Sequence, residues 1–172
     1  GLSEPLKKCF LLFANWRKFK MDATTLAKYL DLANHHPETT PEQIKDLCLK
    51  VKTYGLHAVF VNPSFVPLAK EILGEGLVGT VVSFPLGQDV LEVKVLAAQR
   101  AVQDGADELD VSMNVGLLKA GQYEEVLGEM KQVVAVAKEP ARSVVVKFIL
   151  ETGLLTDEEI KKASELVVAS GA

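Results

Sequence analysis

The stretch SVVVKFILETG, residues 143–153, decides the fold of this chain because a lysine stands in the middle of it. Without Lys147 the run would be an apolar, β-branched segment of the kind buried in a parallel sheet. Side chains alternate along a strand, so Lys147 shares a face with Val145 and Ile149, and the opposite face is wholly apolar. Lysine is seldom fully buried unless it is paired, so its presence here needs a reason.

A second segment, ELDVSMN at residues 108–114, is also divided into two faces. Its polar face holds Glu108, Asp110, Ser112 and Asn114, and the residues between them are apolar. In an open, doubly wound sheet, helices cover both faces, and central strands are apolar on both sides. A polar face instead suits the lumen of a barrel, where active sites are built at the top. The two segments together favour a barrel.

The rest of the chain alternates β-like runs with segments of helical period. The segments that predict strands are 27–33, 57–62, 78–84, 108–114 and 143–150. Four apolar stripes at helical spacing lie within 44–51, 91–102, 126–137 and 160–167. Signals for helix starts and stops are Thr40-Pro41-Glu42, Thr156-Asp157-Glu158, Gly55 and Gly105. Repeated strand–helix alternation predicts an α/β fold with a parallel sheet.

Two architectures accommodate five βα units in 172 residues. A doubly wound open sheet, as in a flavodoxin-like binding domain, suits the length. A (β/α)8 TIM barrel normally needs about 250 residues, so this chain would contain only about its first five βα units. The polar face of 108–114 and the lack of a Gly-rich first turn argue against the open sheet. We therefore expect the partial TIM barrel.

The composition is that of an ordinary globular domain, with 48% hydrophobic and 24% charged residues. A formal net charge of −4 offers no basic field for nucleic acid. Cys9 and Cys48 match no zinc or CxxC spacing, and two lone cysteines suit a reducing, cytoplasmic setting. No apolar run approaches the roughly 18–20 residues that a transmembrane helix requires, so no membrane span is expected.

Residues 1–20 differ from the remainder of the chain in charge. They contain five basic residues and one acidic residue, whereas the remainder is strongly acidic. The composition changes at Met21, and we interpret residues 1–20 as a basic N-terminal extension outside a core domain of residues 21–172. An amphipathic helix that binds a membrane surface is the functional alternative for this segment.

The chemistry available to Lys147 depends on its protonation. Burial disfavours the charged form of lysine and can lower its pKa from about 10.4 towards neutrality. A neutral amine attacks aldehydes and ketones to form a Schiff base, whose iminium withdraws electrons from a neighbouring carbon–carbon bond. A nearby carboxylate such as Asp110 could move the protons. The alternative is a structural ion pair of Lys147 with Asp110 or Glu151, and spacing does not separate the two.

Five runs of sequence closely resemble the deoxyribose-phosphate aldolase family, over about residues 24–172. They are KYLDLANHHPETTPEQI, AVFVNPSFVPLAKEIL, GTVVSFPLG, DGADELDVSMNVGLLKAG and VVVKFILETGLLTDEEIKKASELVVASGA. The resemblance implies a TIM barrel and a class I aldolase, which uses a lysine Schiff base and neither metal nor cofactor. It implies cleavage of 2-deoxy-D-ribose 5-phosphate to acetaldehyde and D-glyceraldehyde 3-phosphate in nucleoside catabolism.

The same resemblance assigns roles to individual residues. It makes Lys147 the Schiff-base lysine and Asp110 the aspartate that relays protons through a bound water. Asp31, on the first strand, belongs to the same polar network. The partners implied are a small phosphorylated sugar as substrate and further copies of the chain in a homo-oligomer, with no nucleic acid and no membrane.

Three departures from the family pattern bear on the site. Where residues 31–37 read DLANHHP, the family commonly reads DHTLLKP, so the hydroxyl expected at Ala33 is missing. Position 60 often carries cysteine in the family, and Phe60 could narrow the pocket here. His35 and His36 have no third metal ligand at useful spacing, so they predict a solvated loop.

The other charged residues have simpler interpretations. His57 precedes an apolar run and is expected at a strand boundary. Lys94, Arg100 and Lys119 are expected to be solvated helix or loop charges. No Gly-rich phosphate cradle of the Walker or GxGxxG type occurs, which argues against a nucleotide site.

The family pattern continues beyond this sequence into a strand with a KTSTG motif. That motif supplies a second lysine that helps to keep the Schiff-base lysine deprotonated, and the last two strands bind the substrate phosphate. Two functions therefore stay open for this chain. One is an aldolase, and the other is a truncated, catalytically weak or inactive relative that only associates with itself or with a partner.

Overall fold

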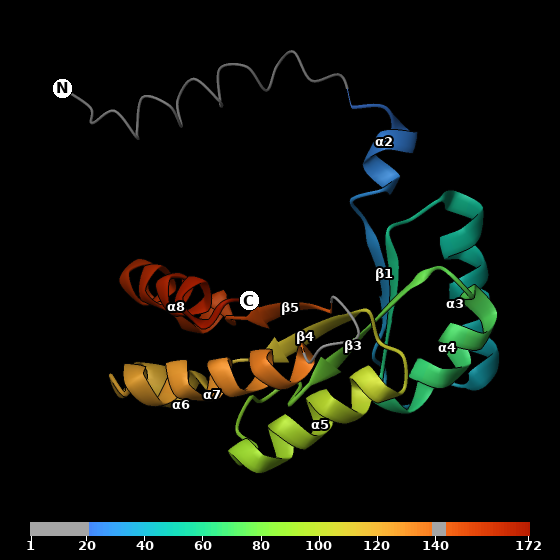
Figure 1. The fold of residues 1–172 in the computed structure, drawn as a ribbon. Coiled ribbons are helices and arrows are strands. Elements are labelled where there is room, and N and C mark those ends of the chain that lie inside the picture. The colour runs from blue at the N-terminus through green and yellow to red at the C-terminus, as the bar shows by residue number, and fades with distance from the viewer. Residues whose placement is uncertain (1–20, 139–143) are drawn as a thin grey trace.

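The computed structural model of the protein describes residues 21–138 and 144–172, and Figure 1 shows their arrangement. Five parallel strands form one sheet, in which each strand pairs with the next strand in sequence. The strands are β1 (Asp31–Asn34), β2 (Ala58–Val61), β3 (Leu77–Val82), β4 (Glu108–Ser112) and β5 (Val145–Ile149). The extension expected at residues 1–20 lies outside the described residues.

Helices connect the strands and pack around the outside of the sheet (Figure 1). The α-helices are α2 (Ala23–Ala27), α3 (Pro41–Tyr54), α4 (Val66–Leu73), α5 (Leu91–Gln103), α6 (Val115–Lys119), α7 (Tyr123–Ala137) and α8 (Asp157–Ser170). Two short 3-10 helices are η2 (Pro63–Phe65) and η3 (Thr152–Leu154). No helix within the described ranges is long and apolar enough to cross a membrane.

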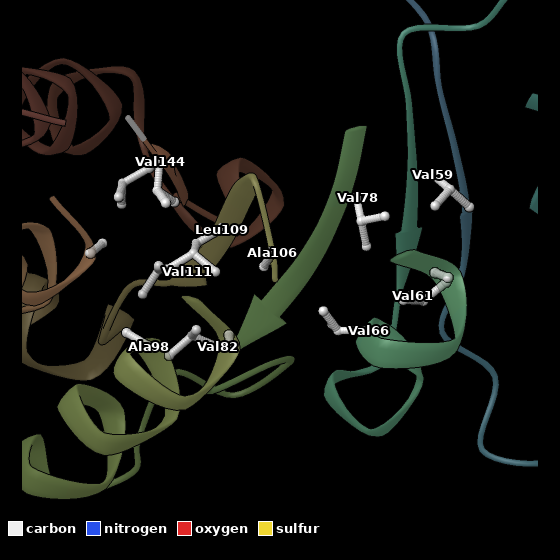
Figure 2. Close-up of a cluster of buried hydrophobic side chains, with 14 of the residues drawn as sticks. Val59, Val61, Val66, Val78, Val82, Ala98, Ala106, Leu109, Val111 and Val144 are labelled. Carbon is white, nitrogen blue, oxygen red and sulfur yellow. The ribbon is translucent and has the colours of Figure 1, made fainter. Parts of the chain in front are cut away.

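One face of the sheet forms the main core. Val59, Val78 and Leu109 belong to a cluster that includes buried side chains of α3, α4, α5 and α7 (Figure 2). Val146 of β5 belongs to the same cluster. A strand order without reversal, with helices on a single face, is that of a barrel and not of a doubly wound sheet. The predicted partial TIM barrel is confirmed, and the flavodoxin-like alternative is wrong.

The predicted strands match the structure except at the first. Residues 27–33 were expected to form a strand, but β1 begins at Asp31, and Ala23–Ala27 form the short helix α2. The reason is a local cap: the carboxylate of Asp22 accepts a hydrogen bond from the backbone N–H of Thr25, at 2.7 Å. The apolar residues at 26–30 therefore belong to a helical turn and the segment after it.

The helix boundaries follow the signals in the sequence. Thr40 and Gln43 form a reciprocal capping box at the start of α3, and Gly55 ends that helix in the left-handed conformation, with φ of 62°. Thr156 and Glu159 form the same box at the start of α8. Helix α4 was not predicted, because its eight residues give an apolar pattern only two turns long.

Lys94 is buried, so the expectation of a solvated charge is wrong for this residue. Its side chain is 2% exposed, and its Nζ lies 2.6 Å from Oε2 of Glu129, across the contact between α5 and α7. The expectation holds for Arg100, which is 71% exposed beside Asp104. The partner of Lys94 is 35 residues away in the sequence, so no local pattern could reveal the pair.

We predict that Glu129→Ala lowers the free energy of unfolding by about 3–5 kcal/mol, because it leaves a buried ammonium without its partner. The matched control is Asp46→Ala, which breaks the exposed Lys50–Asp46 pair on α3 and should cost about 0.5 kcal/mol or less. Urea denaturation followed by circular dichroism measures both. Equal losses in the two variants would contradict a special role for the buried pair.

Candidate active site

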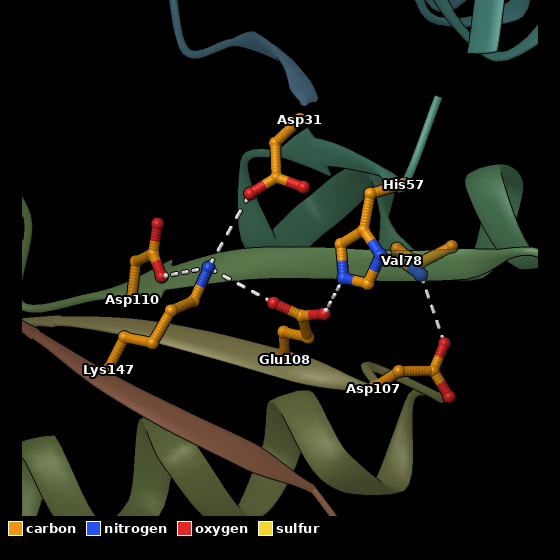
Figure 3. A network of polar contacts seen from close by, with 7 residues as sticks. All are labelled: Asp31, His57, Val78, Asp107, Glu108, Asp110 and Lys147. Atoms are coloured by element: carbon orange, nitrogen blue, oxygen red, sulfur yellow. Dashed lines mark hydrogen bonds and ion pairs between the residues drawn. The ribbon is translucent and has the colours of Figure 1, made fainter. Parts of the chain in front are cut away.

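The side chain of Lys147 lies on the face of the sheet that the helices leave uncovered (Figure 3). Lys147 is the direct partner of Asp110 in the register of β4 and β5, so both side chains point the same way. The Nζ atom lies 3.1 Å from Oδ1 of Asp110 and 3.6 Å from Oδ2 of Asp31. The structure therefore brings together all three residues expected at the site.

Glu108 is a fourth member that the sequence reasoning did not include among the site residues. It opens β4, two residues before Asp110, and its Oε2 lies 3.0 Å from Nζ of Lys147. The other oxygen, Oε1, lies 2.8 Å from Nε2 of His57, which precedes β2 as expected for a boundary histidine. The alternation of side chains had placed Glu108 on the face of Asp110, and that signal alone could have found it.

Phe60 forms an aromatic wall beside the amine. Its ring centroid lies 4.3 Å from Nζ of Lys147, within the range of a cation–π interaction, and the residue is 2% exposed. Its direct partner on β3 is Gly79. A Cβ atom at position 79 would lie 2.2 Å from the ring, so the ring occupies the space that a larger residue would fill.

The electrostatic surroundings of Lys147 oppose the decrease in its pKa that burial was expected to cause. Burial alone lowers the pKa of Lys147, but hydrogen bonding and charge from Glu108 and Asp110 outweigh it, so the pKa is raised. The amine is therefore an ammonium in the resting site. The expectation that burial moves the lysine towards neutrality is wrong for the described residues, because the carboxylates of Glu108 and Asp110 outweigh the effect of burial.

The pKa of Asp110 is raised as well. Burial is the largest cause, Lys147 lowers the pKa, and the nearby charges of Asp31 and Glu108 raise it again. A carboxyl group with a raised pKa takes up and releases a proton more easily at neutral pH than an ordinary aspartate does. Asp110 is thus suited to carry protons next to the amine.

His35 lies in a loop as expected, but its ring is not fully solvated. It follows β1 and is half-buried, with its Nδ1 3.3 Å from Oδ1 of Asn62 and its ring 5.6 Å from that of Phe84. Burial is the main cause that lowers the pKa of His35, so the ring is neutral at pH 7. His36 is exposed, as expected. Within the described residues, no three His, Cys, Asp or Glu side chains are grouped to hold a metal ion.

The carboxyl ends of β4 and β5 border an open cavity, which we call the mouth. A cavity of about 600 Å³ is lined there by Ser112, Ile149 and Gln88, among others. The hydroxyl of Ser112 is buried and has no hydrogen-bond partner among the described residues. Asn114, expected on the same polar face, instead caps α6 by accepting a hydrogen bond from the N–H of Leu117.

We predict that Gly79→Ala lowers the free energy of unfolding by about 1–3 kcal/mol, because the new methyl group clashes with the Phe60 ring. The matched control is Gly128→Ala on α7, where nothing lies within 4 Å of the new Cβ. That change should stabilise the chain by about 0.5–1 kcal/mol. In a Phe60→Ala background, the added methyl group of Gly79→Ala no longer meets the ring and should cost much less. A double-mutant cycle of unfolding free energies measures this difference.

We predict that Glu108→Gln lowers the pKa of Lys147, because it removes a negative charge and weakens the hydrogen bond that is the largest single cause raising that pKa. The fraction of neutral amine below the pKa then increases, and an amine-specific acylating reagent labels Lys147 faster at about pH 8. Peptide mass spectrometry across a pH series measures the shift. Asp107→Asn is the matched control, because Asp107 binds Lys70 and the N–H of Val78 at the same end of the sheet. Unchanged labelling of Lys147 in Glu108→Gln would contradict the inference that Glu108 raises the pKa of Lys147.

Comparison with known proteins agrees with this geometry. Residues 19–172 match the family described as DeoC/LacD family aldolase. The deoxyribose-phosphate aldolase of Thermococcus gammatolerans is 47% identical over 86% of this chain, and that of Carboxydothermus hydrogenoformans is 45% identical over 88%. The matched regions make up 66% and 68% of those relatives, so the chain spans about two thirds of their length.

A solved structure shares the fold. The deoxyribose phosphate aldolase of Aeropyrum pernix, described as having a unique tetrameric structure, superposes with a TM-score of 0.79 at 31% identity. The match covers 88% of this chain and 63% of that protein. Fold, sequence and matched family agree, and the chain belongs to the DeoC/LacD family of aldolases.

Proposed function

We propose that the protein is a deoxyribose-phosphate aldolase, which reversibly cleaves 2-deoxy-D-ribose 5-phosphate to acetaldehyde and D-glyceraldehyde 3-phosphate. The observation that carries the proposal is the contact of one amine, Nζ of Lys147, with carboxylates of Asp31, Glu108 and Asp110 on the lumen face. Aldolase chemistry through a Schiff base needs an amine and carriers for its protons, and this cluster supplies both.

The reaction begins when Nζ of Lys147 attacks the aldehyde carbon C1 of the open-chain sugar. Loss of water from the adduct gives an iminium ion. A base removes the proton of the C3 hydroxyl, the C2–C3 bond breaks, and its electron pair moves into the enamine that C1 and C2 form with nitrogen. C3 becomes the aldehyde carbon of D-glyceraldehyde 3-phosphate, which leaves. Protonation at C2 and hydrolysis then release acetaldehyde and restore the amine.

Asp110 is the residue that we assign to the protons on the substrate side. It contacts Nζ directly, and its raised pKa lets it accept the hydroxyl proton and return a proton to C2. Asp31 contacts the ammonium from the first strand, at 3.6 Å, and we assign it to the same polar network. A water molecule between Asp110 and the substrate is part of this assignment.

The mouth beyond Lys147 is the entry that we assign to the sugar. Ser112 lies two residues after Asp110 on the same strand, and its unpartnered hydroxyl offers a hydrogen bond to a polar ligand or to a water. The position agrees with the rule that active sites of such barrels lie at the carboxyl ends of the strands.

We also infer the setting in which the enzyme works. Cys48 is a free, buried thiol, which suits the reducing cytoplasm. The products of the cleavage are small aldehydes, so a role in sugar and nucleoside catabolism follows from the proposed reaction. A homo-oligomer is proposed by analogy with the tetrameric relative from Aeropyrum pernix.

We predict that borohydride reduction in the presence of acetaldehyde, or of 2-deoxyribose 5-phosphate, fixes a covalent adduct on Lys147. Intact mass shows the added group, and peptide mapping places it on the segment around residue 147. Lys147→Ala should abolish the adduct, and so should Lys147→Arg, which keeps the positive charge but provides no nucleophilic amine.

The controls separate a Schiff-base site from general lysine reactivity. Lys94 and Lys70 are paired lysines elsewhere in the fold, and neither should carry the adduct. Circular dichroism verifies that each variant is folded. A folded chain that yields no adduct on Lys147 with either aldehyde would favour the alternative, an inactive relative that only associates with itself or with a partner.

A further inference from the structure

Two side chains at the carboxyl ends of β1 and β2, His35 and Asn62, take no part in the proposed chemistry. Side chains alternate along a strand, so His35 shares the face of Asp31, and Asn62 shares the face of Phe60. Asp31 and Phe60 both contact Nζ of Lys147 from the lumen face. We therefore place His35 and Asn62 on the wall of the lumen, further towards the carboxyl ends of the strands.

The contacts of His35 agree with this placement. Its Nδ1 lies 3.3 Å from Oδ1 of Asn62. Burial is the main cause that lowers the pKa of His35, but the charge of Asp110 acts in the opposite direction, so the ring lies within range of that carboxylate. The ring also packs against that of Phe84, with 5.6 Å between the centroids, and the two residues after Phe84 line the mouth. His35 thus borders the mouth from the side of β1.

The hydrogen bond to Asn62 fixes what the ring of His35 can offer to a ligand. A carbonyl oxygen accepts, so Nδ1 donates and carries the proton of the neutral ring. Nε2 then has a free lone pair. It forms no hydrogen bond within the described part of the chain, and solvent reaches it. Such a nitrogen accepts a hydrogen bond from a hydroxyl group but offers nothing to a phosphate dianion, whose oxygens are acceptors as well.

The position of His35 along the chain decides which part of the sugar meets the ring. Asp31 contacts Nζ of Lys147, and His35 lies four residues later, roughly 13 Å along the strand direction. Ala33, between them on the same face, is exposed, so the wall is open to a ligand there. A sugar bound to the amine through C1 therefore presents its far end to His35. Its C3 hydroxyl loses its proton in the reaction, which leaves the C4 hydroxyl as the donor.

We propose that Nε2 of His35 accepts a hydrogen bond from the C4 hydroxyl of the open-chain sugar, and that Asn62 is a positioning residue that holds the ring in the accepting tautomer. The inference rests on the proposed function, because it takes the sugar of that reaction as the ligand. It adds a group that selects a hydroxylated substrate and that moves no proton in the reaction.

The test is the affinity of the intact chain for 2-deoxy-D-ribitol 5-phosphate, measured by isothermal titration calorimetry near neutral pH. This alditol has no carbonyl group, so its binding does not depend on a Schiff base. The comparison ligand is the same alditol without the hydroxyl at C4. We expect the parent to bind the first ligand about 10-fold more tightly, which is the contribution of one good hydrogen bond.

Variants of the two residues connect this preference to the ring. His35→Phe keeps a ring against Phe84 but has no acceptor, so it should bind the two ligands equally. His35→Gln should restore part of the preference, because its amide oxygen accepts. Asn62→Leu should reduce the preference, since the ring then adopts both tautomers. The matched control is His36→Phe at the exposed neighbouring position, which should keep the parent preference. Circular dichroism verifies that each variant is folded.

The outcomes separate this contact from the function on which it rests. A preference for the C4 hydroxyl that His35→Phe abolishes and His36→Phe retains supports the contact. Equal affinity of the parent for both ligands, or an unchanged preference in His35→Phe, would overturn it. A parent that binds neither alditol would overturn the contact together with the sugar site at the mouth. The Schiff-base chemistry stands or falls separately, on the borohydride adduct at Lys147.

Discussion

The direct pairing of Asp110 with Lys147 across β4 and β5 is the constraint on which the site depends. A slip of one residue would turn Lys147 towards the helix-covered face, into the cluster that holds Val133 and Val146. A lone ammonium among those side chains would be costly. The apolar outer face and the charged lumen face therefore specify the same register, one by packing and the other by charge.

The charges that hold the site together also oppose its chemistry. Glu108 and Asp110 lie on one strand face, and Lys147 between them relieves their repulsion. The same contacts raise the pKa of Lys147 and so disfavour the neutral amine that attacks aldehydes. The contacts that stabilise the resting site thus lower the reactivity of the lysine. The reaction depends on groups that can remove a proton from the ammonium of Lys147.

The fold could be predicted largely from the sequence, because strand polarity is a local pattern. The two faces of 108–114 and 143–150 were sufficient to choose the barrel over the open sheet. One error was local, at the first strand, where Asp22 caps a short helix. Other errors concern contacts between distant residues. The burial of Lys94 depends on Glu129, and the packing of His35 depends on Asn62 and Phe84. These partners lie far from Lys94 and His35 in the sequence.

The order of the strands has a consequence for how the site comes into being. Every strand pairs with the strand synthesised just before it, so the sheet can grow from the ribosome one βα unit at a time. Glu108 and Asp110 emerge first and lie side by side without a counter-charge until β5 arrives. The strand that brings the positive charge between them is also the one that brings the nucleophile. The carboxylates that keep Lys147 protonated are therefore already in the sheet when the amine joins it.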